Sequence, residues 1–194
     1  MTKFYYGSME LEVPESVYSP EEDSLLLAKH IERLDLGDKS VLEVGCGSGF
    51  LSIVAAKGGA TVTATDINEE AVEITKLNTK ANSFAIKAVK SDMFSAIKGT
   101  FDLIIFNPPY LPVEEGETDP TYAGGKSGRE VIERFAAGVK SRLKPNGSVL
   151  MVISSLTGER EVIDLFSKEK MKASTVAREK IPWEELIVVE AREF

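Results

Sequence analysis

The chain has 194 residues, of which 43% are hydrophobic and 28% are charged, and this composition predicts a folded domain rather than a disordered polymer. A net charge of −8, from 23 Lys and Arg against 31 Asp and Glu, argues against autonomous nucleic-acid binding. One cysteine and one histidine exclude an internal disulfide and a Cys/His metal site. No apolar run approaches the roughly 20 residues of a membrane span, and the start lacks a signal-peptide pattern, so we expect a cytoplasmic protein without membrane contact.

The predicted elements begin with a helix near the N-terminus. Ser19-Pro20-Glu21-Glu22 has the pattern of a capping box with Ser19 at the N-cap, and the helix that follows ends before Gly37. Apolar runs and turn residues then predict strands at 40–45, 61–66, 85–89, 101–106 and 148–154, and helices at 68–81, 131–143 and 157–170. Two extended segments, 174–178 and 185–191, follow. Trp183 lies between them, and we expect it to pack in the core or at the sheet edge.

The order of these elements predicts the fold. Strands that alternate with helices indicate a parallel sheet with helices on both faces, and the last two segments indicate an antiparallel pair at one end of it. We therefore predict an α/β fold, a Rossmann-like three-layer sandwich with a seven-stranded, mostly parallel sheet. We expect a single domain over 1–194, in which 1–36 form an N-terminal extension and helix and 37–194 form the Rossmann-like core.

A glycine-rich loop follows the first predicted strand of the sheet. Gly45, Gly47 and Gly49 permit a tight turn and a close approach of the backbone to a ligand, as in nucleotide-binding loops. Their G-x-G-x-G spacing departs from the dinucleotide fingerprint G-x-G-x-x-G, and Glu43 would face a bound pyrophosphate. A cationic or zwitterionic nucleoside tolerates that carboxylate better than a phosphate does.

Acidic residues follow the next two predicted strands. Asp66 lies where such folds bind ribose hydroxyls, and Ile67 beside it can pack on an adenine face. Asp92, with Met93 beside it, can accept a hydrogen bond from an exocyclic adenine amine. Each acidic residue alone is as often a helix cap or a solvated loop charge, so their ordered arrangement after successive strands carries the prediction.

Asn107-Pro108-Pro109-Tyr110 follows the apolar strand at 101–106 and therefore lies at the carboxyl edge of the sheet, where open α/β sheets bind ligands. The two prolines restrict φ and remove two backbone donors, which leaves a stiff turn that displays carbonyl oxygens. The Asn107 side-chain oxygen and the Pro108 carbonyl can accept both hydrogens of a planar NH₂ group, and Tyr110 can pack on its face. An ordinary rigid turn is the alternative interpretation.

Three segments carry a family resemblance. They are Tyr18-Ser-Pro-Glu-Glu-Asp23-Ser24-Leu-Leu-Leu27, Asn107-Pro-Pro-Tyr110 and Ala123-Gly-Gly-Lys-Ser-Gly-Arg129-Glu130-Val131. Together they resemble the HemK-like release-factor glutamine methyltransferases, a branch of the class I S-adenosylmethionine-dependent methyltransferases, and the short archaeal and eukaryotic form in particular. Asn-Pro-Pro-Tyr is shared with adenine N6 and guanine N2 methyltransferases, so the first and third segments carry the more specific part of the resemblance.

The resemblance implies roles around S-adenosylmethionine, with S-adenosylhomocysteine as the product. Ser24, Glu43 and Gly45 would contact the methionine part, Asp66 would hold the ribose, and Asp92 with Met93 would hold the adenine. The expected cofactor-binding residues are Ser24, Glu43, Gly45, Cys46, Gly47, Gly49, Asp66, Ile67, Asp92, Met93 and Asn107, and the expected catalytic residues are Asn107, Pro108, Pro109 and Tyr110. No metal ligand is expected.

The implied reaction is N5-methylation of the glutamine in the Gly-Gly-Gln loop of a class I peptide chain release factor. The short form of the family acts with a small zinc-binding activator protein. An unpaired apolar strand at a sheet edge can template strand addition by a partner, and we expect the activator to dock on the edge strand near Phe84–Val89.

Three alternatives remain open at this stage. A nucleic-acid amino methyltransferase acting on adenine N6 or guanine N2 uses the same Asn-Pro-Pro-Tyr chemistry, although the net charge of −8 counts against it. Lysine side chains of other proteins are secondary targets to consider. A cofactor-binding module that stabilises a partner without catalysis is the third alternative, and the intact Asn107–Tyr110 segment speaks against it.

Overall fold

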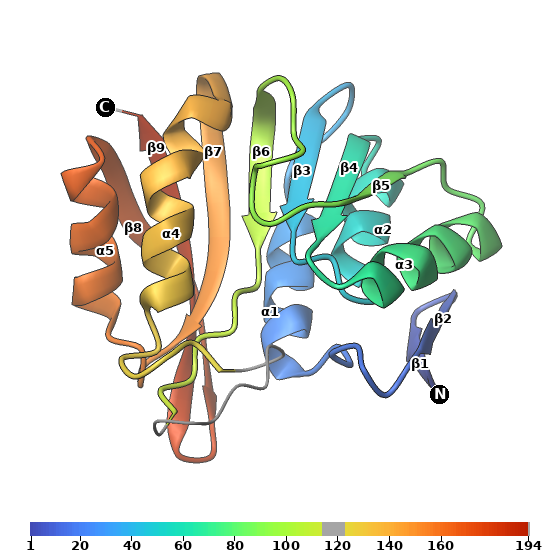
Figure 1. The fold of residues 1–194 in the computed structure, drawn as a ribbon, viewed down its shortest axis with the longest axis horizontal. Coiled ribbons are helices and arrows are strands. Elements are labelled where there is room, and N and C mark those ends of the chain that lie inside the picture. The colour runs from blue at the N-terminus through green and yellow to red at the C-terminus, as the bar shows by residue number, and fades with distance from the viewer. Residues whose placement is uncertain (114–122, 194) are drawn as a thin grey trace.

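A central seven-stranded sheet organises the molecule, with the strand order β5-β4-β3-β6-β7-β9-β8 (Figure 1). The computed structural model describes residues 1–113 and 123–193. The strands of the sheet are β3 (Ser40–Val44), β4 (Thr61–Asp66), β5 (Lys87–Lys90), β6 (Phe101–Phe106), β7 (Leu143–Ser154), β8 (Met171–Ile181) and β9 (Glu184–Glu193). The helices are α1 (Glu22–Ile31), α2 (Phe50–Lys57), α3 (Glu69–Ala81), α4 (Glu130–Val139) and α5 (Glu159–Lys168), with a 3₁₀ turn at Lys140–Arg142.

The pairing confirms the predicted fold. Strands β3 to β7 pair in parallel, whereas β9 runs antiparallel to both β7 and β8. The chain winds outward from β3 through β4 to β5, and then returns to the other side of β3 to form β6. Loops at the carboxyl ends of β3 and β6 therefore diverge, which opens a crevice at this switch point where open α/β sheets bind their ligands.

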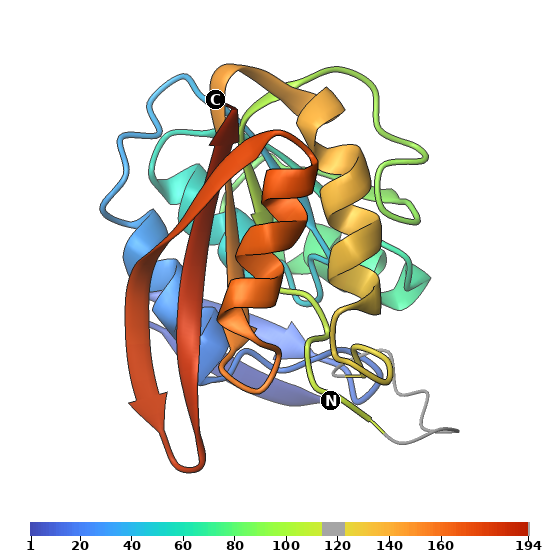
Figure 2. The ribbon, with the colours of Figure 1, turned by 90° about the vertical axis from the view of Figure 1, so that its left-hand side faces the viewer.

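Helices cover both faces of the sheet because successive strand residues point to opposite faces. In β6, Ile104 and Phe106 are buried in the cluster that contains α4 and α5 residues, whereas Leu103 and Ile105 are buried with α1 and α2. Figure 2 shows α1 and the α4–α5 pair on opposite sides of the sheet. This arrangement is the predicted three-layer sandwich, and its two apolar layers hold β3 and β6 rigidly beneath the crevice.

A small hairpin precedes the sheet and was absent from the sequence-based prediction, which described residues 1–36 only as an extension and helix. Strands β1 (Thr2–Tyr6) and β2 (Met9–Val13) pair antiparallel through a two-residue turn at Gly7-Ser8, where Gly7 has φ +58°. Met9, Leu11 and Val13 alternate with acidic residues and are buried. This period-two pattern is the signal that identifies the hairpin.

Several predicted boundaries were wrong. Ser19 does not cap α1, which begins at Glu22, and the backbone N–H of Ser24 in its first turn is instead bonded by the Asp23 carboxylate. Residues 144–147, which separate the predicted helix at 131–143 from the predicted strand at 148–154, lie inside β7 at a register shift against β6. Trp183 is not packed in the core, because it is 98% exposed. Within residues 1–113 and 123–193, no helix has the length and apolarity needed to cross a membrane.

Candidate active site

A cavity of about 840 Å³ opens at the carboxyl ends of β3, β4, β5 and β6. It contains nearly all of the site residues predicted from the sequence. These are Ser24, Glu43, Gly45, Cys46, Gly47, Asp66, Ile67, Asp92, Met93, Asn107, Pro108, Pro109 and Tyr110. Gly49 is the exception, since it is not among the lining residues. The parallel strands thus bring together residues that are far apart along the chain.

The glycine loop adopts a backbone that favours glycine. Gly45, Gly47 and Gly49 have φ values of +69°, +51° and +82°, in the left-handed region that other residues enter at a cost. Gly49 precedes the first turn of α2, and an added Cβ there would lie 3.0 Å from a Thr75 methyl carbon. Gly49 therefore shapes the loop against α3, while Gly45 and Gly47 face the cavity.

Glu43 is the second-last residue of β3 and lies inside the protein. Its side chain lines the cavity but is only 2% exposed, and it accepts a hydrogen bond from the Ser52 hydroxyl on α2. Burial raises the pKa of the Glu43 carboxyl to about 8, because the charged form is desolvated. Nearby Cys46 is buried as well, and burial raises the pKa of its thiol well above the usual value. The protonated thiol accepts a hydrogen bond from Thr75 and acts as a space-filling group rather than a nucleophile.

Asp66 connects the end of β4 to the glycine loop. One carboxylate oxygen accepts the Gly47 N–H at 2.9 Å and the other accepts the Asn68 N–H at 2.9 Å. Each oxygen retains a lone pair for a hydroxyl donor in the cavity. Ile67 is 60% exposed beside it, so an apolar surface lies next to a pair of acceptors. This combination suits a nucleoside, whose sugar is polar and whose base has apolar faces.

The loop after β5 contributes Asp92 and Met93 at the rim. The Asp92 carboxylate receives both of its hydrogen bonds from Arg134 of α4, each at 2.8 Å, across an exposed ion pair. Met93 has φ +49°, a conformation that is uncommon for residues other than glycine. This strained backbone holds the Met93 side chain at the cavity wall.

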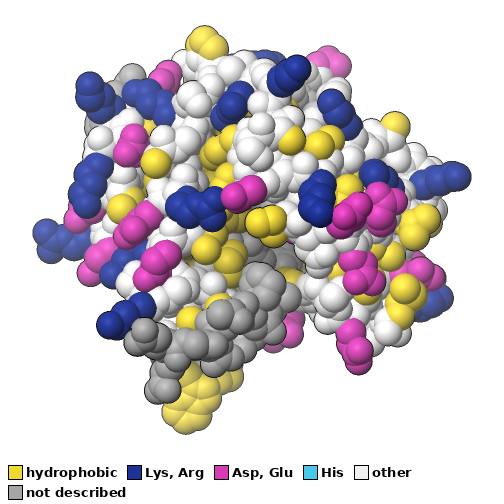
Figure 3. Space-filling view, viewed as in Figure 1, with side chains coloured by type: hydrophobic (Ala, Val, Ile, Leu, Met, Phe, Trp, Pro, Cys, Tyr) yellow, Lys and Arg dark blue, Asp and Glu magenta, His cyan; other side chains and the backbone are white. Residues whose placement is uncertain are grey.

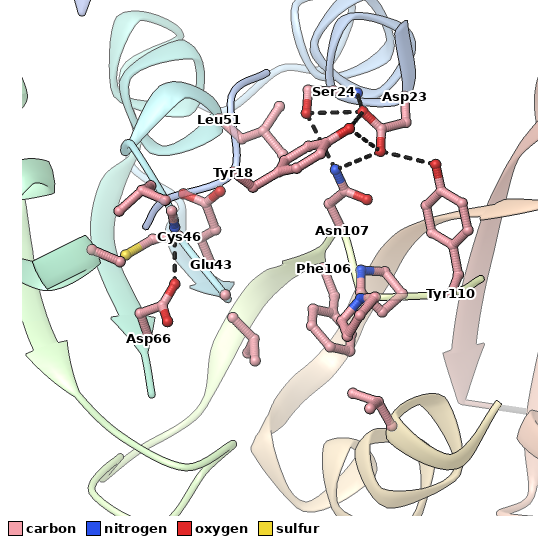
Figure 4. A pocket seen from close by; sticks show the side chains of 18 of the residues that line it. Tyr18, Asp23, Ser24, Glu43, Cys46, Leu51, Asp66, Phe106, Asn107 and Tyr110 are labelled. Atoms are coloured by element: carbon pink, nitrogen blue, oxygen red, sulfur yellow. Dashed lines mark hydrogen bonds between the residues drawn. The ribbon is translucent and has the colours of Figure 1, made fainter. Parts of the chain in front are cut away.

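Asp23 is the centre of a hydrogen-bond network that holds Asn107 (Figure 4). The Asn107 Nδ2 group donates to Asp23 Oδ2 at 3.1 Å and to Ser24 Oγ at 3.2 Å. The hydroxyls of Tyr18 and Tyr110 also donate to the Asp23 carboxylate, at 3.0 Å. A carboxylate accepts but does not donate, so the amide nitrogen of Asn107 must face Asp23 and its oxygen must face away.

The oxygen of Asn107 is consequently left without a partner. Asn107 Oδ1 is buried and has no hydrogen bond within the described parts of the chain. An unsatisfied buried acceptor is costly and rare, and in a cavity wall it marks the place where a ligand donor binds. The cavity therefore presents a fixed acceptor beside the carbonyl-rich turn of Pro108 and Pro109.

The sequence-based prediction missed Asp23 as a site residue. Its neighbour Ser24 was assigned a cofactor contact, but the structure shows that Asp23 organises Asn107, Tyr18 and Tyr110 together. Burial raises the pKa of both tyrosine hydroxyls, and the Asp23 charge raises it further, so both remain protonated donors. An acidic residue next to a hydroxyl residue at the start of a helix was the available signal.

Comparisons with known proteins agree with this geometry. The sequence model of the family described as methyltransferase small domain matches residues 14–180. The chain is 43% identical to a putative protein N5-glutamine methyltransferase of Methanocaldococcus jannaschii, covering 94% of this chain and 95% of that protein. It is 31% identical to the methyltransferase HEMK2 of Homo sapiens, covering 89% and 88%.

A solved structure shows the same architecture. In the Mtq2–Trm112 complex of E. cuniculi, responsible for methylation of the translation termination factor eRF1, the matching chain superposes with a TM-score of 0.78 at 27% identity, over 92% of this chain and 99% of that one. The cavity at the switch point, the Asn-Pro-Pro-Tyr turn and these likenesses lead to one conclusion. The chain belongs to the methyltransferase small domain family, among relatives that include a protein N5-glutamine methyltransferase and HEMK2.

Proposed function

We propose that this chain is an S-adenosylmethionine-dependent methyltransferase that methylates the side-chain amide of the glutamine in the Gly-Gly-Gln loop of a class I peptide chain release factor. The observation that carries this proposal is the buried Asn107 Oδ1, which lacks a donor and is aimed by Asp23. A primary amide supplies such a donor. The names of the M. jannaschii and E. cuniculi relatives support the same substrate class.

The residues of the cavity fit S-adenosylmethionine. Two carboxyl groups, Glu43 and Asp66, lie in the wall next to open glycine backbone, and a cationic ligand beside Glu43 would favour its ionised form, which suits a cationic ligand with a ribose better than a pyrophosphate. The exposed Ile67 offers an apolar surface to the adenine. We assign Glu43 and Ser24 to the methionine part, Asp66 to the ribose, and Asp92 with Met93 to the adenine. When bound, the cofactor supplies an electrophilic methyl group on a sulfonium centre.

The protein's own residues act on the target amide. Its nitrogen is a poor nucleophile because the lone pair is delocalised into the carbonyl. Asn107 Oδ1 and the Pro108 carbonyl accept its two hydrogens, which localises density on nitrogen and orients the lone pair. Because Asn107 is held by Asp23 and Ser24, this orientation is preorganised, and effective molarities from such positioning correspond to ~7–11 kcal/mol at their upper range.

The charge distribution favours a protein substrate over a nucleic acid. Figure 3 shows acidic and basic side chains interspersed on one face, without a continuous basic stripe among the coloured residues. The Asp92–Arg134 pair neutralises an arginine at the rim. Because a polyanion is held by neutralising its phosphates, this surface gives little affinity for RNA or DNA.

We also propose that a small zinc-binding activator protein docks on β5. Among the residues that the structure describes, this strand is at the sheet edge and pairs with β4 alone, so its outer side carries backbone groups suited to strand addition. Ile86 lies just before the β4–β5 ladder, which begins at Lys87. Ile86→Pro therefore removes an outer N–H without breaking the ladder, and it should abolish copurification of the activator. Ile86→Ala is the matched control, and an intact heterodimer with Ile86→Pro would contradict this docking site.

The experiment that tests the function measures methyl transfer from labelled S-adenosylmethionine to a purified class I release factor in the presence of the activator. We expect mass spectrometry to place the label on the Gly-Gly-Gln glutamine, and Asn107→Ala to abolish it. Asn146→Ala is the control, because Asn146 lies near the amino end of β7, whereas the cavity opens at the carboxyl ends of the parallel strands. Label on RNA, DNA or a lysine, without label on the glutamine, would replace the proposed substrate.

A further inference from the structure

The turn between β8 and β9 carries an exposed tryptophan, and the residues that flank it line the cavity. Trp183 is 98% exposed, although tryptophan has a large apolar surface that is normally covered. Figure 2 shows the β8–β9 hairpin extending beyond the neighbouring strand β7 at the end that carries this turn. Pro182 and Trp183 form the turn itself, since Ile181 pairs with Glu184 across it.

The backbone of this turn is strained for a large residue. Trp183 has φ +75°, and the proline before it restricts its own φ to negative values. Proline followed by a left-handed residue is the pattern of a type II turn, whose second central position normally holds glycine. A tryptophan there costs about 1–3 kcal/mol of conformational strain without gaining burial. Strained positions that packing does not explain cluster at binding sites.

The residues on either side of the turn belong to the cavity. Ile181 and Glu184 both line it, together with Tyr110. Glu184 Oε2 is buried and lacks a hydrogen-bond partner within the described residues, as Asn107 Oδ1 does. The same stretch of chain thus combines an exposed aromatic ring with a hydrogen-bond acceptor that has no donor among the described residues. Both lie at the rim of the cavity, where a macromolecular substrate must enter.

We propose that the Ile181–Glu184 turn is the platform that holds the polypeptide on either side of the target glutamine. Trp183 packs on the apolar surface of the substrate loop, and Glu184 accepts one of its backbone N–H groups. This inference rests on the proposed function, because only a protein substrate brings flanking backbone to the rim. The occupant follows from the position of the turn, which is continuous with the cavity that binds the target side chain.

The variant Trp183→Gly distinguishes a substrate-binding role of Trp183 from a role in the stability of the fold. Glycine relaxes the left-handed position, so the variant should unfold at the same or a higher temperature than the wild type. Its KM for the release factor should rise about tenfold, with a smaller change in kcat, because an aromatic anchor at an interface is lost. Trp183→Phe should recover part of the affinity. Tyr5→Ala, an exposed aromatic residue on β1, is the matched control and should keep the wild-type KM.

Trp183 is the only tryptophan, so its fluorescence reports binding directly. Binding of a tryptophan-free peptide that contains Gly-Gly-Gln should shift the emission of Trp183 to shorter wavelength. An unchanged KM in Trp183→Gly, or a lower unfolding temperature without a KM effect, would overturn the platform while leaving the proposed function intact. Absence of glutamine methylation by the wild-type protein would instead overturn the proposed function, and the platform with it.

Discussion

The side chain of Asp23 determines which atom of Asn107 faces the substrate. Its carboxylate can only accept, so it selects the amide nitrogen of Asn107 and directs the oxygen toward the cavity. The hydroxyls of Tyr18 and Tyr110 hold the carboxylate in place from two other segments. Asp23 is therefore a positioning residue, since it orients the residue that we expect to bind the target amide.

Replacing this carboxylate tests that role. In Asp23→Asn the side chain can donate as well as accept, so the orientation of Asn107 is no longer unique. We expect kcat/KM to fall on the order of 10- to 100-fold, the usual effect of losing a supporting partner of a site residue, while cofactor affinity changes less. Steady-state kinetics and cofactor titration measure the two effects. Asp164→Asn on the exposed side of α5 is the control, and an equal loss in both variants would refute a specific role for Asp23.

The buried Glu43 predicts a pH dependence of stability. The pKa of its carboxyl is about 8 in the folded protein, against the ordinary value of 4.5 for an exposed glutamate. Between these values the unfolded chain has released a proton that the folded chain retains, so the free energy of unfolding falls as pH rises from about 4.5 to about 8. Glu43→Gln lacks this titration. We expect its stability advantage over the wild type to grow between pH 5 and pH 8 in urea denaturation of the cofactor-free proteins, and a constant difference would contradict this.

At the scale of elements, Asn78 of α3 connects three parts of the site's support. Its side-chain oxygen accepts the Glu12 N–H at 2.9 Å, and its nitrogen donates to the Glu12 carbonyl at 2.8 Å and to the Ser48 carbonyl at 2.9 Å. One amide therefore joins β2 of the N-terminal hairpin, α3 and the glycine loop. The β1–β2 hairpin, which the sequence-based prediction missed, thus supports the glycine loop through Asn78.

Removing this amide should weaken both the fold and the loop. Asn78→Ala leaves the buried Ser48 carbonyl and the partly buried backbone groups of Glu12 without this partner, and each unsatisfied buried group costs about 1–3 kcal/mol. We expect a lower urea midpoint and weaker cofactor binding, since Ser48 belongs to the glycine loop. Lys76→Ala, on the exposed side of α3, should change neither property. Lower stability with unchanged cofactor affinity would show that the Asn78 hydrogen bonds do not influence cofactor binding by the glycine loop.

The elements also show why some features were predictable from the sequence. Strand β6 is continuously apolar from Leu103 to Phe106 because both faces of a parallel sheet are covered, and this run placed Asn107 correctly at its carboxyl end. Asn68 begins the predicted helix at 68–81 and is the N-cap of α3, where its side-chain oxygen accepts the Glu70 N–H at 3.0 Å. Both features depend on neighbours in the sequence.

Other features depend on contacts between distant segments. Asp23 and Asn107 are far apart in the chain, and their hydrogen bond exists only because folding brings the start of α1 next to the segment that follows β6. The exposure of Trp183 could not be predicted, because hydrophobicity favours burial unless a binding role overrides it. Asp92 was expected to accept a hydrogen bond from an adenine amine, and the sequence did not indicate that Arg134 from α4 would pair with it. The sequence patterns predicted the fold and most of the named residues that line the cavity, but not how those residues contact one another.

At the scale of the whole molecule, the proposed activator surface and the proposed substrate surface lie at different edges of one sheet. Strand β5 and strand β8 are the two edge strands, and the cavity lies between them at the switch point. The activator is assigned to the β5 edge, and the substrate loop is assigned to the turn that ends β8. Because the two surfaces are separate, both partners can be present while the cavity remains open to the target side chain.

The cavity wall combines several segments of the chain, and this predicts how a ligand affects global stability. Its wall combines residues 16–24, which precede the sheet, with the ends of β3, β4 and β6. A ligand held by all of them is released when any part unfolds, so it stabilises the whole molecule by mass action. S-adenosylhomocysteine at 100 times its Kd should add about 2.7 kcal/mol and raise Tm by about 5–10 °C. Asp66→Ala should lose most of this shift in differential scanning calorimetry, while Asp164→Asn should keep it. A Tm that does not respond to the ligand in the wild type would mean that the cavity is not the cofactor site.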